Sequence, residues 1–150
     1  MNRDYGARPT PAYPGAADPA ELTALGIGRL PGTLGIKITG ALQGRIEAEM
    51  PVVPAVLAPN GYLHAASVVA LADTAAGFGC RLSLPSGAAG FTTLEQKTSY
   101  VGTARTGTVR TVAVLVHGGR STQVWDAEVF DDDGGRIALF RCTQLLLWPK

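Results

Sequence analysis

One stretch of the sequence, Asn60 to Cys80, constrains the fold more than any other. It reads NGYLHAASVVALADTAAGFGC, and its small and apolar residues follow one another with few interruptions. Between Glu49 and Arg81 the only side chain with a formal charge is the carboxylate of Asp73. A helix that is apolar on nearly every side is typical of a buried position. The stretch therefore predicts one central helix that is buried nearly all round.

Asp73 is the feature of this helix that needs a chemical explanation. An ionised carboxylate is costly to remove from water unless it is paired, hydrogen-bonded or protonated. The structural interpretation is a buried carboxylate that bonds to a neighbouring amide or to Thr74. The functional interpretation is a carboxylate that acts on a substrate, and the motif around it, described below, favours this second interpretation.

Composition indicates a single domain that acts on neither nucleic acid nor membranes. The 150 residues are 46% hydrophobic, which is enough for a core without disulfides or metal. Charged residues make up only 17%, which suggests that an oligomer hides some surface, and the net charge of +1 attracts no anionic partner. Asp73 argues against a membrane span, and no signal-like segment precedes it, so we expect a cytoplasmic protein. Cys80 and Cys142 fit neither a metal spacing nor a disulfide framework, and we expect reduced thiols.

The chain divides into a tail and one folded domain. Residues 1–17 contain several prolines and glycines and few large apolar side chains, so we expect a flexible tail there. The folded domain is expected over residues 18–150. It opens with a short helix, because Asp18 suits the capping position and Pro19 the first helical position, and the helix should stop before Gly26.

The other elements are predicted to be strands. Clean alternation of apolar and polar residues over 36–50 predicts one long, half-buried strand, which Gly40 and Gly44 could bend. Four extended segments follow the helix, at residues 92–101, 108–116, 121–130 and 136–148. The connections between them are short and contain glycine, at residues 101–107, 117–120 and 131–135. Such connections predict antiparallel hairpins, and the whole predicts an α+β fold with a curved sheet around one helix.

Two short motifs stand at the start and in the middle of the predicted helix: NGYLHAA at residues 60–66 and ALADTA at residues 70–75. Together they resemble the signature of the hotdog-fold acyl-CoA thioesterases, in the PaaI-type branch of the phenylacetate pathway. The order of strand, helix and meander over residues 28–148 is similar to that fold. The resemblance implies hydrolysis of an acyl- or aryl-CoA without a metal or organic cofactor, since the coenzyme A arrives with the substrate.

The resemblance also implies roles for individual residues. Asp73 falls on the catalytic carboxylate, which acts as a general base on water or as a nucleophile toward the thioester carbonyl. His64 and Ala65 fall on the helix start, where a backbone amide polarises that carbonyl. Thr93 falls on a hydroxyl position that in some members orients the attacking water. The structural alternatives are a capping histidine and an ordinary strand threonine.

Further residues are candidates for binding the substrate. Asn60, Gly61 and Ala66 belong to the motif at the helix start, and Ala66 is the second of two alanines where many relatives carry glycines. Lys97 and Arg120 are candidates for contacts with the phosphates of coenzyme A. The alternative for both basic residues is an ordinary solvated charge near the end of a strand.

The spacing of the two main candidates requires a second chain. Unsatisfied N–H groups at a helix start suit an oxyanion, and Ala65 would supply one. At 1.5 Å per residue, however, that amide lies roughly 12 Å from Asp73 along the helix, too far for both to serve one carbonyl carbon. Two antiparallel helices related by a two-fold axis would bring them together. We therefore expect a homodimer, possibly a dimer of dimers.

Two other functions are compatible with much of the sequence. One is a hydratase or dehydratase of the same fold acting on acyl thioesters, but the Phe-Pro-containing loop expected beside its histidine is absent. The other is a non-catalytic acyl-CoA-binding or dimerisation module, which would not need a carboxylate at Asp73. The sequence does not fix the acyl group.

Overall fold

A six-stranded antiparallel sheet curls around one long helix in this computed structural model, which describes residues 16–150. The elements in chain order are α1 (Pro19–Ala24), α2 (Leu30–Thr33), β1 (Lys37–Leu42), β2 (Arg45–Pro51), the 3-10 turn η1 (Pro54–Val56), α3 (Ala65–Leu82), β3 (Gly90–Tyr100), β4 (Thr108–Gly118), β5 (Thr122–Phe130) and β6 (Arg136–Leu147). The predicted α+β architecture is confirmed. The predicted tail, residues 1–17, lies almost entirely outside the described residues.

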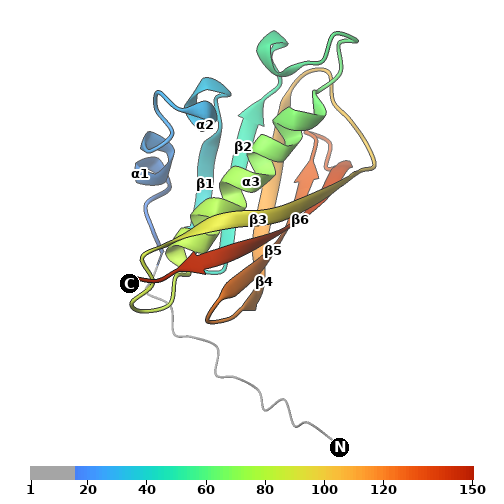
Figure 1. Cartoon of the computed structure of the whole chain (residues 1–150). Helices are drawn as coiled ribbons and strands as arrows, with labels where there is room; N and C mark the ends of the chain where they lie inside the picture. Colours follow the sequence, from blue (N-terminus) through green and yellow to red (C-terminus); the bar gives the residue numbers. More distant parts are fainter. Residues whose placement is uncertain (1–15) are drawn as a thin grey trace, which may run out of the picture.

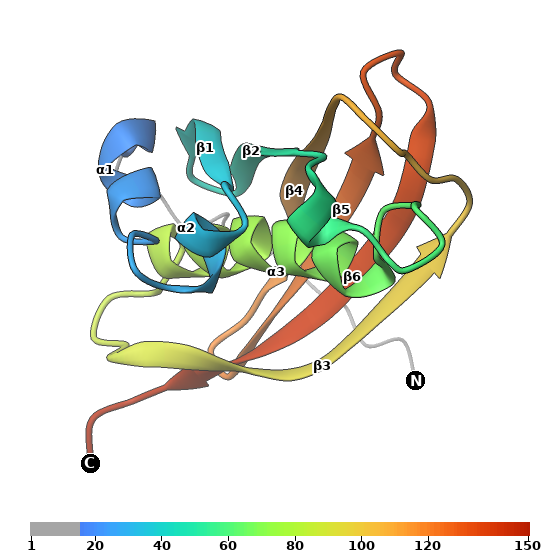
Figure 2. The same cartoon turned by 90° about the horizontal axis from the view of Figure 1, so that it is seen from above.

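The strand order in the sheet is β1-β2-β4-β5-β6-β3, so β1 and β3 are the two edges. Figure 1 shows α3 lying across the concave side of the sheet, with α1 and α2 beside β1. Seen from above in Figure 2, β1 and β3 lie on opposite sides of α3 because the sheet curves around the helix. The helix is thus enclosed by strands on one side and borders the β3 edge on the other.

The segment predicted as one long strand, residues 36–50, is instead the hairpin β1–β2. Leu42 lies opposite Arg45 in the ladder, and only two residues connect the strands. Gly44, the second of them, has a φ of 75°. Two-residue hairpin turns need positive φ, which glycine adopts without steric cost. The prediction of a single bent strand was therefore wrong.

A β-bulge in β1 explains why the alternation looked unbroken. The ladder register shifts between Ile38 and Gly40. Beyond the bulge Ala41 is buried and Leu42 is 56% exposed, the reverse of the predicted faces. The hairpin turn shifts the alternation back, so that Ile46 is buried again. Because the two shifts cancel, residues 36–50 read as one strand of period two.

The hairpin predicted between the segments that became β3 and β4 does not form. β3 pairs with β6, and β5 and β6 separate it from β4, whereas the predicted hairpins β4–β5 and β5–β6 are confirmed. Crossing three strand spacings requires about 14 Å, which the seven residues 101–107 can span. Val101 and Gly102 both donate to the Ile137 carbonyl on the way. A Cβ on Gly102 would lie 2.7 Å from the Arg136 carbonyl oxygen, so this crossing needs glycine.

The central helix is confirmed, and one of its faces packs very closely against the sheet. Trp125 of β5 is fully buried, and its ring lies against Gly79 of α3. A Cβ at Gly79 would be 2.5 Å from the ring, so the helix and the strand can approach this closely only with glycine there. By length and composition alone α3 could cross a membrane, but here it is the core helix of the domain.

The opposite face of α3 is open, contrary to the prediction of a helix buried nearly all round. A stripe along it is only half-buried or exposed: Ala66, Val69, Ala70, Asp73, Thr74, Gly77, Phe78 and Arg81. These residues recur at helical spacing and therefore form one face. The sheet of a single chain curves around only part of the helix, which leaves this stripe uncovered.

Candidate active site

Asp73 lies in the middle of the open face of α3. Its Oδ1 atom is buried, and the part of the chain from residue 16 onward offers it no hydrogen-bond partner. Burial raises the pKa of the Asp73 carboxyl above its ordinary value. The structural interpretation needed a bond from a neighbouring amide or from Thr74, and Oδ1 receives neither. A buried, unpaired carboxylate of this kind favours the functional interpretation.

A cleft of about 330 Å³ opens beside Asp73. Its lining comes from α2, α3 and β3: Pro31, Asp73, Thr74, Gly77, Phe78, Arg81, Phe91 and Thr93. The structure thus brings together two of the predicted catalytic residues, Asp73 and Thr93, from elements that are distant in sequence. Two phenyl rings and a proline give the cleft apolar walls beside its one carboxylate. Such a site can hold an apolar group while the carboxylate acts at its end.

The other candidates for catalysis lie at the first turn of α3. The Nδ1 atom of His64 accepts a hydrogen bond from the Ala66 amide at 2.9 Å, so His64 caps the helix. The Ala65 amide has no acceptor within residues 16–150, and Ala65 is exposed. Of the two alanines, it is therefore Ala65 that keeps an N–H free to stabilise an oxyanion.

Asn60 and Gly61 shape the loop that leads into α3. The Asn60 side-chain oxygen accepts from the Tyr62 amide at 3.1 Å, and Gly61 has a φ of 82°. The Tyr62 ring lies under the Arg105 guanidinium, 4.7 Å from its centroid. Both motif residues therefore hold the turn that places the helix start. Their contact with substrate stays a prediction.

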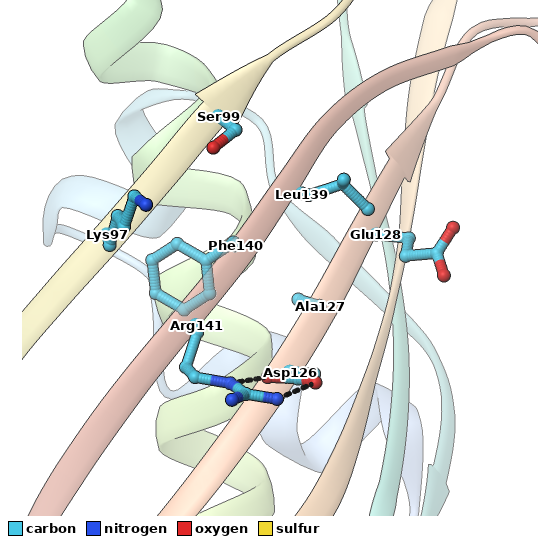
Figure 3. Close-up of a pocket in the computed structure, with 8 residues that line it drawn as sticks. All are labelled: Lys97, Ser99, Asp126, Ala127, Glu128, Leu139, Phe140 and Arg141. Atoms are coloured by element: carbon cyan, nitrogen blue, oxygen red, sulfur yellow. Dashed lines mark hydrogen bonds and ion pairs between the residues drawn. The ribbon is translucent and has the colours of Figure 1, made fainter.

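Neither basic candidate lies in the Asp73 cleft. Lys97 borders a second hollow of about 280 Å³, shown in Figure 3 with α3 behind the strands. The hollow also contains Arg141, which pairs with Asp126 and alternates along β6 with buried neighbours, so it faces away from the helix. Arg120 stacks on the Trp148 ring at 4.8 Å. Their contacts with coenzyme A also stay predictions.

Six of the residues that line the cleft were not among the sequence candidates, and three of these six are large and apolar: Pro31, Phe78 and Phe91. Nothing in the sequence marks them, because apolar residues in a helix or strand are ordinary core material. The α2 helix, which carries Pro31, is only four residues long and was not predicted. Helical spacing places Phe78 on the same face of α3 as Asp73, whereas only the tertiary fold brings Pro31 of α2 and Phe91 of β3 to that face.

A long central helix wrapped by a curved antiparallel sheet is the hotdog fold. Comparison with known proteins agrees: the family described as "Thioesterase superfamily" matches residues 60–138. The chain belongs to this family, and it is a thioester hydrolase. The family assignment favours hydrolysis over the two alternatives considered from the sequence.

Individual relatives support the same assignment. The chain is 34% identical over 129 residues to 1,4-dihydroxy-2-naphthoyl-CoA hydrolase of Escherichia coli (strain K12), covering 84% of this chain and 92% of that protein. The crystal structure of a mutant of thioesterase PA1618 from Pseudomonas aeruginosa matches with a TM-score of 0.85 and 28% identity, covering 90% of this chain and 97% of that one. The E. coli PaaI protein, at 24% identity and a TM-score of 0.72 over 78% of this chain and 83% of that one, shares the fold.

Proposed function

We propose that the protein is an acyl-CoA thioesterase that hydrolyses an acyl- or aryl-CoA to the free acid and coenzyme A. The observation that carries this proposal is the unpaired, partly buried carboxylate of Asp73 in an apolar cleft. The aromatic walls formed by Phe78 and Phe91 suit an aromatic acyl group. The similarity to a hydrolase of an aromatic CoA thioester supports the same substrate class.

Asp73 can promote hydrolysis in either of two ways. As a general base it takes a proton from water while the water oxygen bonds to the thioester carbon, and the C–S bond then breaks to release the thiol. As a nucleophile, an Asp73 oxygen bonds to the thioester carbon and the C–S bond breaks to release the coenzyme A thiolate. Water then hydrolyses the resulting mixed anhydride to the free acid and the restored Asp73 carboxylate. In both routes the carbonyl oxygen becomes negative, and the free Ala65 N–H is the donor proposed to stabilise it.

The active unit is proposed to be a homodimer. α3 runs unbroken from Ala65 through Asp73, so the two groups lie roughly 12 Å apart along one helix. The open stripe of α3 borders β3, an edge strand whose side chains are mostly exposed. Leu94, Tyr100 and Val101 add large exposed apolar side chains there. A second copy seated on this surface would cover the stripe and bring its own Ala65 to Asp73.

A cytoplasmic location is also part of the proposal. Cys80 and Cys142 are both free and buried, as expected for reduced thiols. Burial raises the pKa of each thiol to about 12, so neither is a reactive thiolate. Free thiols are compatible with a reducing compartment.

The first test removes the carboxylate. Asp73→Asn should lower thiol release from a panel of acyl- and aryl-CoA substrates by on the order of a hundredfold or more. Asp126→Asn, on the far face of the sheet, is the matched control and should leave turnover close to wild type. A hydratase would alter the acyl chain without releasing thiol. Unchanged hydrolysis in Asp73→Asn would refute the mechanism.

The second test removes a single backbone proton. Proline is well tolerated at the first helical position, and the extended backbone of His64 suits the residue before it, so Ala65→Pro should fold normally. Without the N–H, turnover should fall on the order of a hundredfold, whereas Ala65→Gly keeps the amide and should stay active. Wild-type turnover in Ala65→Pro would exclude this amide from the oxyanion site.

Combining the two variants tests whether the site spans two chains. In a dimer of one Asp73→Asn and one Ala65→Pro subunit, one of the two sites has both groups intact. Random pairing of equal amounts makes half of the dimers mixed, so co-expression should restore about a quarter of wild-type activity. If both groups acted within one chain, the mixture would be as inactive as its components.

A further inference from the structure

Gln144 is a fully buried amide that touches the proposed site without lining it. It lies on β6 with 0% exposure, directly opposite Thr93 in the ladder with β3. Its side-chain oxygen accepts a hydrogen bond from the Thr93 hydroxyl at 2.9 Å. Its amide nitrogen points the other way and donates to the Cys142 sulfur at 3.4 Å. The strand register thus fixes the contact between Gln144 and a residue of the Asp73 cleft.

This contact decides what the Thr93 hydroxyl can offer to the cleft. A hydroxyl has one proton and two lone pairs, and here the proton is committed to Gln144. Toward any other partner, including one in the cleft that Thr93 lines, this hydroxyl can therefore only accept a hydrogen bond. If the Thr93 hydroxyl turned to water instead, the buried oxygen of Gln144 would lose the one hydrogen bond that it accepts from residues 16–150, which is costly.

We propose that Gln144 is a positioning residue that fixes Thr93 as a hydrogen-bond acceptor for the attacking water. The water gives one hydrogen bond to Thr93 and the other to Asp73, so one of its two lone pairs can be directed at the thioester carbon. Asp73 takes its proton as the oxygen–carbon bond forms, and the Thr93 proton does not move. The inference rests on the proposed thioesterase function and adds to it the arrangement of the nucleophile.

A second buried glutamine, Gln123, makes it possible to separate the proposed role of Gln144 from the effect of losing any buried amide. Gln123 of β5 lies directly opposite Gln144 in the next ladder and is 1% exposed. Its nitrogen donates to the Ser83 carbonyl at 2.6 Å, and its oxygen accepts from the Trp125 indole at 2.9 Å. These contacts hold the end of α3 and the core tryptophan. Gln123 thus provides a matched control with equal burial and no contact to the cleft.

The test is a double-mutant cycle on the full-length protein, with Thr93→Val, Gln144→Leu and the double variant. Each single variant should lower kcat about tenfold and leave KM within about twofold, because each disturbs the water rather than substrate binding. The double variant should be no slower than Thr93→Val, because Gln144 acts only through that hydroxyl. Thr93→Ser keeps the hydroxyl and should recover most of the kcat that Thr93→Val loses. Gln123→Leu should lower the melting temperature but keep kcat.

Several outcomes would overturn the inference. Gln144→Leu with a wild-type kcat would do so, as would losses that multiply to about a hundredfold in the double variant. If Gln144→Leu does not fold, Gln144→Met is closer in length and makes the same test. Failure of the proposed function looks different: no thiol release by wild type, or full activity in Asp73→Asn, removes both proposals. Loss of activity in Asp73→Asn together with an additive cycle removes this one alone.

Discussion

At the scale of single residues, Asp73 makes stability depend on pH in an unusual direction. Burial raises the pKa of its carboxyl above the ordinary value of 3.8, so the folded state binds the proton more tightly than the unfolded state. The resulting stabilisation is complete below pH 3.8 and is lost as the pH rises through the raised pKa. Compared with Asp73→Asn, the wild type should therefore be less stable at pH 7, and the difference should shrink in acid.

Urea unfolding of the two proteins between pH 4 and pH 8, in steps of about half a unit, measures this difference. Asp126→Asn again serves as the control, because Asp126 pairs with Arg141 on the outer face of the sheet. If the difference in the free energy of unfolding between wild type and Asp73→Asn grew toward low pH, the assignment of a raised pKa to Asp73 would be contradicted.

The carboxylate proposed to act in catalysis could be singled out from the sequence, but its surroundings could not. Asp73 is recognisable because it is the lone charge in a long apolar stretch. Gln144 is not recognisable in this way, because a polar residue in a strand of alternating pattern is normally expected to face solvent. Only the pairing of β3 with β6 places it opposite Thr93, and that pairing depends on contacts between residues far apart in the chain. Phe91 was missed for the same reason, because only the placement of β3 beside α3 brings it to the cleft.

At the scale of the elements, the closest contact between α3 and the sheet predicts a severe substitution. In Gly79→Ala the new methyl group would lie 2.5 Å from the buried Trp125 ring, so helix and strand must separate. Overpacking of this kind costs about 1–3 kcal/mol, which exceeds the gain in helix propensity of up to about 1 kcal/mol. The free energy of unfolding should fall accordingly, as measured by urea denaturation.

Gly77→Ala is the control on the same helix. Its methyl group would meet only the Phe91 ring, at an ordinary contact distance of 3.7 Å. The free energy of unfolding of Gly77→Ala should therefore equal that of wild type or slightly exceed it. Equal effects of the two substitutions would mean that the Trp125 contact does not limit the packing of α3.

Elements were predicted well where a pattern stays local. The helix over 65–82 and the hairpins β4–β5 and β5–β6 follow from apolar content and short glycine turns. The prediction for residues 36–50 was wrong because a bulge and a turn each shift the alternation by one residue, and the two shifts cancel. The prediction for β3 was wrong because a seven-residue connection can join two neighbouring strands or cross to a distant one. Only the closure of the sheet around α3 decides between these two arrangements.

At the scale of the whole molecule, the β3 edge predicts how the dimer can be broken. Leu94 lies at the bulge of β3 and is 56% exposed. In Leu94→Asp, two carboxylates would be forced into the proposed interface, so light scattering should report a monomer and thiol release should fall together with it. Leu42→Asp, also at 56% exposure but on the opposite edge strand β1, should remain an active dimer.

A Leu94→Asp variant that is monomeric but active would contradict the two-chain site. If Leu94→Asp and Leu42→Asp had the same oligomeric state and activity, the interface would lie elsewhere. A dimer was inferred from the sequence on two grounds, the sparse charge of the chain and the length of helix between Ala65 and Asp73. The surface proposed to form the dimer could not be predicted, because it depends on which strand lies at the edge of the sheet.

The exposed backbone of β3 also has a consequence for a subunit on its own. An unpaired edge strand offers its N–H and C=O groups to any extended peptide, including unfolded copies of the same chain. If the active site spans two chains as proposed, a solitary subunit is both catalytically incomplete and prone to incorrect strand addition. Pairing with a second copy would satisfy that ladder edge, so the same event that completes the chemistry would also protect the protein from aggregation.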